Sequence, residues 1–110
     1  MEENSELNKL IMQIIAFSGD SISYSMSALD KVVEKNYEEA DKLIEEAEAT
    51  LRKAHQAHTD ILVYEANNQD KNIVSCLLVH ASTHLANAEL SKELTKKIIK
   101  IMQQGGEKSD

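Results

Sequence analysis

No proline interrupts this chain of 110 residues, and two of its three glycines are adjacent near the C-terminus. Proline kinks or ends a helix and glycine weakens one, so the chain has few residues that break helices. Alanine, leucine, glutamate and lysine, which are good helix formers, dominate the composition. The sequence therefore predicts an all-α fold.

Apolar residues recur at helical spacing in three long segments. We expect helices over residues 4–35 and 37–66, and a third that includes Ile73–Met102. Because the connections are short, the helices must fold back into an antiparallel up-down-up bundle. We expect a single domain over residues 1–104. The adjacent glycines are expected to end the third helix and to start a flexible tail over residues 105–110.

Local signals refine these segments. Gly19 lies inside the first one and predicts a close approach of a neighbouring helix, or else a bend. Asn36 and Glu39 have the spacing of a capping box at the start of the second helix, and Asp70 is the expected cap of the third. The buried stripe of the second helix is expected to include the apolar residues at helical spacing together with His58 and Leu62.

The third segment is apolar nearly all round at its start. A helix that must be buried on more than one face of a three-helix unit indicates a partner subunit, so we expect an oligomer packed through this helix. Cys76, the single cysteine of the chain, belongs to this run and is expected to be a buried, unreactive thiol. The run comprises Ile73, Val74, Cys76, Leu77, Leu78 and Val79.

Charge and composition exclude several classes of function. The formal charge of −7 repels phosphate backbones and favours a basic partner protein, and four aromatic residues provide no stacking platform for nucleic acid. We expect no nucleic-acid binding. The acidic N-terminus does not resemble a signal peptide, and no apolar run is long enough for membrane insertion. One cysteine favours a reducing compartment, so we expect a soluble cytoplasmic protein.

Two histidines lie one helical turn apart in the third segment. His80 and His84 share a helix face with Asn87 and Ser91, at spacings of four, seven and eleven residues. A helix gives an imidazole a rigid mount, which repeated phosphoryl or metal contacts require.

The other two histidines are expected at a similar height in the bundle. If the second and third helices turn around residue 69, His58 is level with His80, and His55 is level with His84. All four histidines would then form one layer.

Two functions compete for this layer. One is a zinc site with four imidazole nitrogens, although the chain has no Glu-x-x-His pair of the kind that helical metal sites use. The other is a phosphohistidine carrier, in which a neutral imidazole accepts a phosphoryl group and hydroxyls or amides such as those of Thr83, Asn87 and Ser91 receive its oxygens. For His55 and His58 we favour a simpler interpretation as ordinary core or rim residues.

Several motifs together resemble one family, the lactose/cellobiose (chitobiose) class of enzyme IIA in the phosphoenolpyruvate-dependent sugar phosphotransferase system. The resemblance extends from about Ile14 to Met102. The motifs are Gly19-Asp20, Asn36 to Ala40, Glu45 to Ala47, Ala54 to Ala57, Leu77 to Ala81 followed by His84-Leu85, and Lys92 to Leu94.

The resemblance implies a homotrimer that assembles through helix three, with His80 as the phosphorylated residue. The phosphoryl group would come from the carrier HPr, pass to a cysteine of the cognate IIB protein, and then to a sugar that enters through IIC. The chain would be a phosphotransferase of the protein-N(pi)-phosphohistidine–sugar type. Around His80 we expect His84, Thr83, Asn87, Ser91 and His58. The alternative is a non-catalytic helical assembly or regulatory module with a His-based metal site.

The sequence departs from the family pattern after His80. Ser82 and Thr83 stand where the family has Gln and Asp, and that Asp implies a magnesium ion on the trimer axis. Thr83 lacks the anionic oxygen that magnesium prefers, so we expect no axial metal and no other cofactor. His58 also replaces a common Gln, and neither change touches His80.

Overall fold

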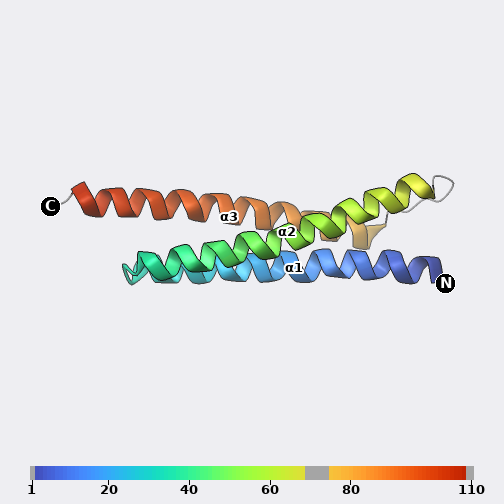
Figure 1. Cartoon of the computed structure of the whole chain (residues 1–110), viewed down its shortest axis with the longest axis horizontal. Coiled ribbons are helices and arrows are strands. Elements are labelled where there is room, and N and C mark those ends of the chain that lie inside the picture. Colours follow the sequence, from blue (N-terminus) through green and yellow to red (C-terminus); the bar gives the residue numbers. More distant parts are fainter. Residues whose placement is uncertain (1, 69–74, 109–110) are drawn as a thin grey trace.

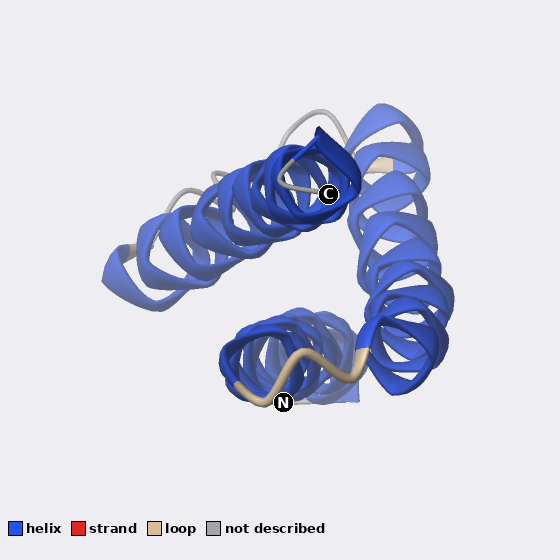
Figure 2. Ribbon diagram, turned by 90° about the vertical axis from the view of Figure 1, so that its left-hand side faces the viewer, coloured by secondary structure: helices blue, strands red, loops and turns tan. Residues whose placement is uncertain are grey.

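The structure, a computed structural model, describes residues 2–68 and 75–108, which form three long helices. These are α1 (Glu2–Val33), α2 (Tyr37–Asn67) and α3 (Cys76–Lys108). α1 and α3 run in the same direction and α2 runs in the opposite one, in a rod 63 Å long with the chain ends at opposite ends (Figure 1). Seen along the rod, the helices stand at three corners of a triangle (Figure 2). The predicted all-α up-down-up bundle is confirmed.

Glu34, Lys35 and Asn36 join α1 to α2. Lys35 has a left-handed φ of 62°, its N–H donates to the Val32 carbonyl at 2.9 Å, and the Asn36 N–H donates to the Lys31 carbonyl at 2.8 Å. These two bonds form a Schellman motif. The Asn36 side chain caps α2 by accepting the Glu39 N–H at 3.3 Å, as predicted. The return bond of the capping box is not formed, because the Asn36 N–H is already bonded to α1.

α1 and α2 pack against each other through small side chains. The buried Ser21 Oγ donates to the Ala47 carbonyl at 2.8 Å. Gly19 is not part of this contact, because a Cβ added to it would meet no atom within 4 Å. The close approach predicted at Gly19 is therefore wrong, and α1 continues through it as a helix. The small residues buried in the two helices are Ser18, Ser21, Ser25, Ala28, Ala40, Ala47, Ala54 and Ala57.

The apolar core has a larger and a smaller part. All three helices contribute to the larger part, which contains Leu7, Leu10, Ile11, Ile14, Leu51, Ala54, Ala57, Ile61, Ala81, Leu85 and Ala88. The smaller part lies towards the α1–α2 turn and contains Ala28, Val32, Ala40, Ile44 and Ile99. The predicted burial of His58 and Leu62 is wrong: His58 is half-buried and Leu62 is 52% exposed, because Ala57 and Ile61 occupy the buried stripe of α2.

Both ends of α3 differ from the prediction. Ser75 precedes the helix and caps it, since its Oγ accepts the Leu78 N–H at 3.1 Å. The predicted cap Asp70 and the predicted helical residue Ile73 lie outside the described residues. At the other end the helix passes through Gly105 and continues to Lys108, because glycine lowers helix stability by only about 1 kcal/mol and does not by itself end a helix.

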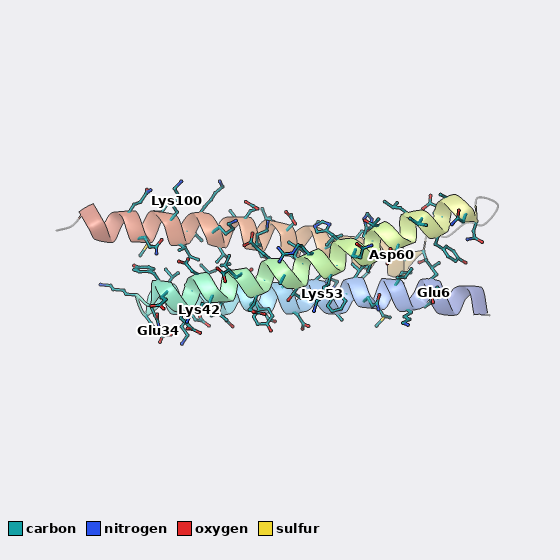
Figure 3. All side chains as sticks on the ribbon, viewed as in Figure 1. Glu6, Glu34, Lys42, Lys53, Asp60 and Lys100 are labelled. Carbon is teal, nitrogen blue, oxygen red and sulfur yellow. The ribbon has the colours of Figure 1, made fainter. Side chains whose placement is uncertain are left out.

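Charged side chains occupy the periphery of the bundle, where Glu34, Lys42 and Lys100 project outward (Figure 3). Over the described residues, none of the helices has a stretch that is hydrophobic and long enough to span a bilayer. α3 nevertheless leaves large apolar side chains uncovered in the single chain. They are Leu77, Val79, Leu90, Leu94, Ile98, Ile101 and Met102.

Candidate functional site

α3 carries the imidazoles of His80 and His84 beside its buried face. Ala81, Leu85 and Ala88 fix the helix in the core. His80 and His84 therefore stand on a backbone that packing holds in place, and they differ in exposure: His80 is exposed and His84 is half-buried.

The two imidazole rings are in direct contact. Nε2 of His80 lies 3.1 Å from Nε2 of His84, the ring centroids are 4.5 Å apart, and the ring planes are nearly perpendicular at 86°. A neutral imidazole carries one N–H and one lone pair, so one Nε2 donates the shared hydrogen bond and the other accepts it. This contact places one nitrogen with a lone pair and one N–H donor side by side on the surface of α3.

A wide cavity opens next to His80 at the start of α3. It has a volume of about 570 Å³ and is lined by Ser75, Cys76, Val79, His80 and Thr83. The prediction of a buried Cys76 is wrong, because Cys76 is exposed in the first turn of α3 and lines this cavity. The cavity gives an incoming group access to the exposed side of His80.

The remaining residues expected around His80 are at different distances from it. The Thr83 hydroxyl lines the cavity but donates its hydrogen to the Val79 carbonyl at 3.1 Å. Asn87 is exposed and Ser91 is half-buried further along α3. With a rise of 1.5 Å per residue, they lie about 10 Å and about 16 Å along the axis from His80. Of the residues expected around His80, His84 is therefore the one that touches its ring within the chain.

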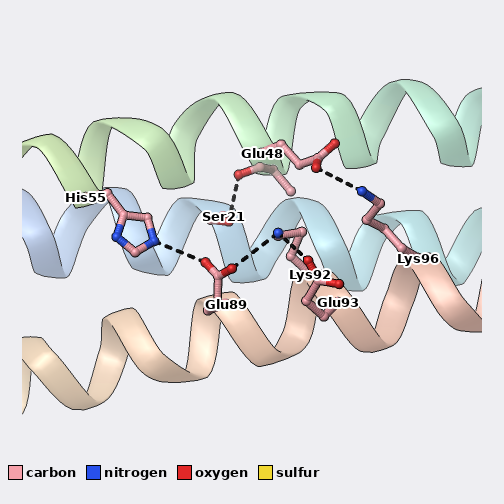
Figure 4. Close-up of polar contacts among 8 residues, drawn as sticks. Ser21, Glu48, His55, Glu89, Lys92, Glu93 and Lys96 are labelled. Carbon is pink, nitrogen blue, oxygen red and sulfur yellow. Dashed lines mark hydrogen bonds and ion pairs between the residues drawn. The ribbon is translucent and has the colours of Figure 1, made fainter.

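Two cross-helix contacts define the register between α2 and α3. Nε2 of His55 lies 3.1 Å from Oε2 of Glu89, and Nζ of Lys96 lies 3.1 Å from Oε2 of Glu48 (Figure 4). The residue numbers of each pair average 72, so the two helices turn around residue 72 and not around residue 69 as predicted. The reason is that α3 begins only at Cys76, so the connection is longer than the loop that the sequence indicates.

This register separates the histidines of α2 from those of α3. His58 becomes level with residue 86, about 9 Å along the axis from His80. The predicted layer of four histidines is therefore wrong. Over the described residues, no group of three or more His, Cys, Asp or Glu side chains is arranged to hold a metal ion. The four-nitrogen zinc site considered from the sequence is not formed.

His55 instead belongs to a chain of polar contacts with α3. Glu89 bonds His55 through one oxygen and Lys92 through the other at 3.4 Å, and Lys92 also contacts Glu93 at 2.6 Å. The hydrogen bond from His55 is the largest cause that lowers the pKa of Glu89, with Lys92 adding to it against partial desolvation. Sequence patterns alone do not single out Glu89, because its partner depends on the register between the two helices.

A comparison with known families identifies the chain. The family described as "PTS system, Lactose/Cellobiose specific IIA subunit" matches residues 9–103, which include all of α2 and most of α1 and α3. The chain belongs to this family. The resemblance seen in the motifs from Gly19 to Leu94 is thereby confirmed.

Individual relatives of this IIA protein cover nearly its full length. The lactose-specific EIIA component of Staphylococcus epidermidis is 32% identical over 91% of this chain and 95% of the relative. The lichenan-specific phosphotransferase enzyme IIA component of Bacillus subtilis is 34% identical over 91% of this chain and 90% of the relative.

Solved structures show the same fold. The cellobiose-specific enzyme IIA of Bacillus anthracis has a TM-score of 0.84 at 30% identity and covers 93% of both chains. PtcA from S. mutans has a TM-score of 0.83 at 32% identity and covers 90% of this chain and 96% of its own. The chain is thus a phosphoryl carrier of the phosphotransferase system that serves uptake of lactose/cellobiose-type sugars.

Proposed function

We propose that His80 is the residue of this IIA protein that accepts the phosphoryl group, from phospho-HPr, and passes it to the cysteine of a lactose/cellobiose-type IIB protein. The observation that carries the proposal is the contact of the exposed His80 ring with His84 at the edge of an open cavity. A carrier needs a nucleophile that two partner proteins reach in turn, and His80 has that exposure on a helix fixed by packing.

Each transfer exchanges one bond to phosphorus for another. The Nε2 lone pair of His80 attacks phosphorus, the bond from phosphorus to the donor imidazole nitrogen breaks, and that nitrogen regains its lone pair. Each ring keeps the N–H on its other nitrogen, so no proton has to move. In the second step a thiolate of IIB attacks, a P–S bond forms and the P–N bond to His80 breaks. Positioning and charge stabilisation provide most of the catalysis in such in-line transfers.

His84 has a specific role in this scheme. Its Nε2 lies 3.1 Å from the accepting nitrogen, so an N–H there reaches an oxygen of the phosphoryl group once it is bound. A charge-assisted hydrogen bond of this kind stabilises the negative charge of about −1.5 to −2 that a phosphoryl group adds. Asn87 and Ser91 lie further along α3 and belong only to the wider surroundings of the site. His58, about 9 Å along the axis from His80, takes no part in it.

We propose that three copies assemble through α3. Thr83, Asn87, Leu90, Leu94 and Ile101 follow one another at spacings of three, four and seven residues, which is the pattern of a coiled-coil seam. Leu90, Leu94 and Ile101 are 58%, 50% and 65% exposed in the single chain. An uncovered apolar stripe of this length is unfavourable in water and is buried by association of like helices.

The residues at the seam do not fit the magnesium ion that the family resemblance implies. The hydroxyl of Thr83 is neutral, and its hydrogen is directed to the Val79 carbonyl of its own helix. A hard cation prefers carboxylate oxygens, which this position lacks. We therefore propose a trimer held by apolar packing and a polar threonine layer. Its working compartment is the cytoplasm, where the carriers HPr and IIB act.

The decisive experiment is phosphorylation in a defined system. The chain is incubated with phosphoenolpyruvate, enzyme I and HPr, and its intact mass is measured. We expect a gain of one phosphoryl group per chain, loss of that gain in His80→Gln, and its retention in the control His58→Gln. Circular dichroism checks that all variants keep their helices. A wild-type chain that stays unmodified beside an active donor, or a His80→Gln variant that is still phosphorylated, overturns the proposal.

A further inference from the structure

The His80–His84 contact has the geometry of a metal chelate. Imidazole nitrogens bind first-row transition metals at about 2.0–2.1 Å. Two nitrogens on one ion are therefore about 3.3 Å apart in tetrahedral coordination and about 2.9 Å apart in adjacent square-planar or octahedral positions. The two Nε2 atoms are 3.1 Å apart, between these values, and they converge from rings that are nearly perpendicular.

We propose that His80 and His84 bind one divalent cation of the Zn²⁺ or Ni²⁺ class through the lone pairs of both Nε2 atoms, with water in the remaining coordination positions. The ring that donates the shared hydrogen bond in the free protein then carries its N–H on Nδ1 instead. The inference rests on the proposed function in one respect: the ion occupies the Nε2 lone pair that attacks phosphorus, so metal and phosphoryl group exclude each other. Transition-metal ions then act as reversible inhibitors of phosphoryl acceptance.

The surroundings favour a cation at this point. The chain carries a formal charge of −7, and the cavity beside His80 leaves room for the water ligands of the ion. Both histidines stand on one packed helix, so little conformational entropy is lost when the second nitrogen binds. Imidazole selects transition metals over Mg²⁺ and Ca²⁺, which prefer oxygen ligands.

The histidines of α2 provide an internal control. His55 and His58 are also close in sequence, but Nε2 of His55 is bonded to Glu89 on α3. No contact among the described side chains brings the rings of His55 and His58 together in the way that joins His80 to His84. The same protein thus contains one histidine pair with converging nitrogens and one without.

The first experiment measures binding directly on tag-free, unphosphorylated protein. ZnCl₂ and, separately, NiCl₂ are titrated in a calorimeter, and ring resonances of the histidines are followed by NMR for the zinc titration. We expect one ion per chain, shifts confined to the rings of His80 and His84, and no response to MgCl₂. His84→Gln should weaken zinc binding by at least about tenfold, because one of two chelating nitrogens is lost.

Two controls test the assignment. His58→Gln should bind zinc as the wild type does. Cys76→Ser should also retain binding, which shows that the exposed thiol in the same cavity is not the ligand. Loss of binding in Cys76→Ser, or binding in His84→Gln as tight as in the wild type, overturns the proposal.

A second experiment separates this proposal from the proposed function. The protein is phosphorylated by phospho-HPr, purified and titrated with ZnCl₂. We expect its affinity for zinc to be at least about tenfold lower than that of the unmodified protein. Equal affinity in both forms contradicts mutual exclusion at His80. A chain that binds zinc through His80 and His84 but takes no phosphoryl group would instead refute the proposed function and leave the metal site standing.

Discussion

Nε2 of His55 on α2 and Oε2 of Glu89 on α3 lie 3.1 Å apart, and this bond crosses the interface between the two helices. Further along the rod, the ion pair of Glu48 with Lys96 crosses the same interface in the same register. These polar contacts define how α3 sits against α2. They therefore position the helix that carries His80.

The His55–Glu89 bond predicts a pH dependence of stability. The pKa of Glu89 is lowered in the folded chain, chiefly by the hydrogen bond from His55. A carboxyl whose folded pKa is depressed stabilises the fold above its unfolded pKa, near 4.3, and loses that contribution as the pH falls through the folded value. Because both side chains are about half exposed, the contribution is only about 0.2–1 kcal/mol.

Chemical denaturation of the wild type and of Glu89→Gln tests this. At pH 6 to 7 the variant should be less stable by about that amount, and the difference should disappear below the folded pKa of Glu89. Glu45→Gln, at an exposed side chain of α2 that forms no ion pair with any described residue, is the matched control and should leave the stability unchanged at both pH values. A difference between wild type and Glu89→Gln that is the same at pH 7 and at pH 2 contradicts the assignment.

The turn between α1 and α2 contains a position that glycine suits better. Lys35 has a φ of 62°, where a side chain other than glycine is strained. Lys35→Gly should raise the free energy of unfolding by about 0.5–1 kcal/mol, measured by urea denaturation. The neighbouring Glu34, which has no positive φ, is the control. Glu34→Gly should give no gain, and an equal gain at both positions would show that strain at Lys35 is not the cause.

Two buried serines of α1 should respond in opposite directions to alanine. Ser25 is fully buried and its Oγ has no hydrogen-bond partner, whereas Ser21 Oγ donates to Ala47. Ser25→Ala removes an unsatisfied group and should stabilise the fold by about 1 kcal/mol, while Ser21→Ala should destabilise it by about 0.5–1.5 kcal/mol. Urea unfolding measures both. Equal losses in the two variants would show that the hydrogen bonding of the buried hydroxyl does not decide its effect on stability.

The proposed trimer seam predicts a specific dissociation. Leu94→Glu places a charge in the apolar stripe of α3 and should convert the trimer to monomers, as measured by analytical ultracentrifugation. Met12→Glu on the outer face of α1, where the side chain is similarly exposed, should remain trimeric. EDTA should leave the wild-type trimer intact, since the seam lacks carboxylate ligands. Dissociation by EDTA would contradict a seam without a metal ion.

Some features of the molecule depend on local chemistry alone. The helices, the cap at Asn36 and the contact of His80 with His84 all follow from residues within one or two turns of each other. Such features are determined by backbone geometry, because residues four apart on a helix are neighbours whatever surrounds them. The proposed acceptor His80 and the family motifs are features of this local kind.

Features that depend on several helices together needed the tertiary structure. The sequence indicated that α2 and α3 turn around residue 69. The bonds of His55 to Glu89 and of Glu48 to Lys96 show that they turn around residue 72. This register moves the α2 histidines away from His80. Likewise Gly19 faces open space and Cys76 faces a cavity, since the phase of each helix against its neighbours decides which side is covered. The amino-acid sequence by itself determined three helices and a paired imidazole. Only packing decided the helix register, because a helix can slide by a turn at little local cost and long-range contacts alone select one position.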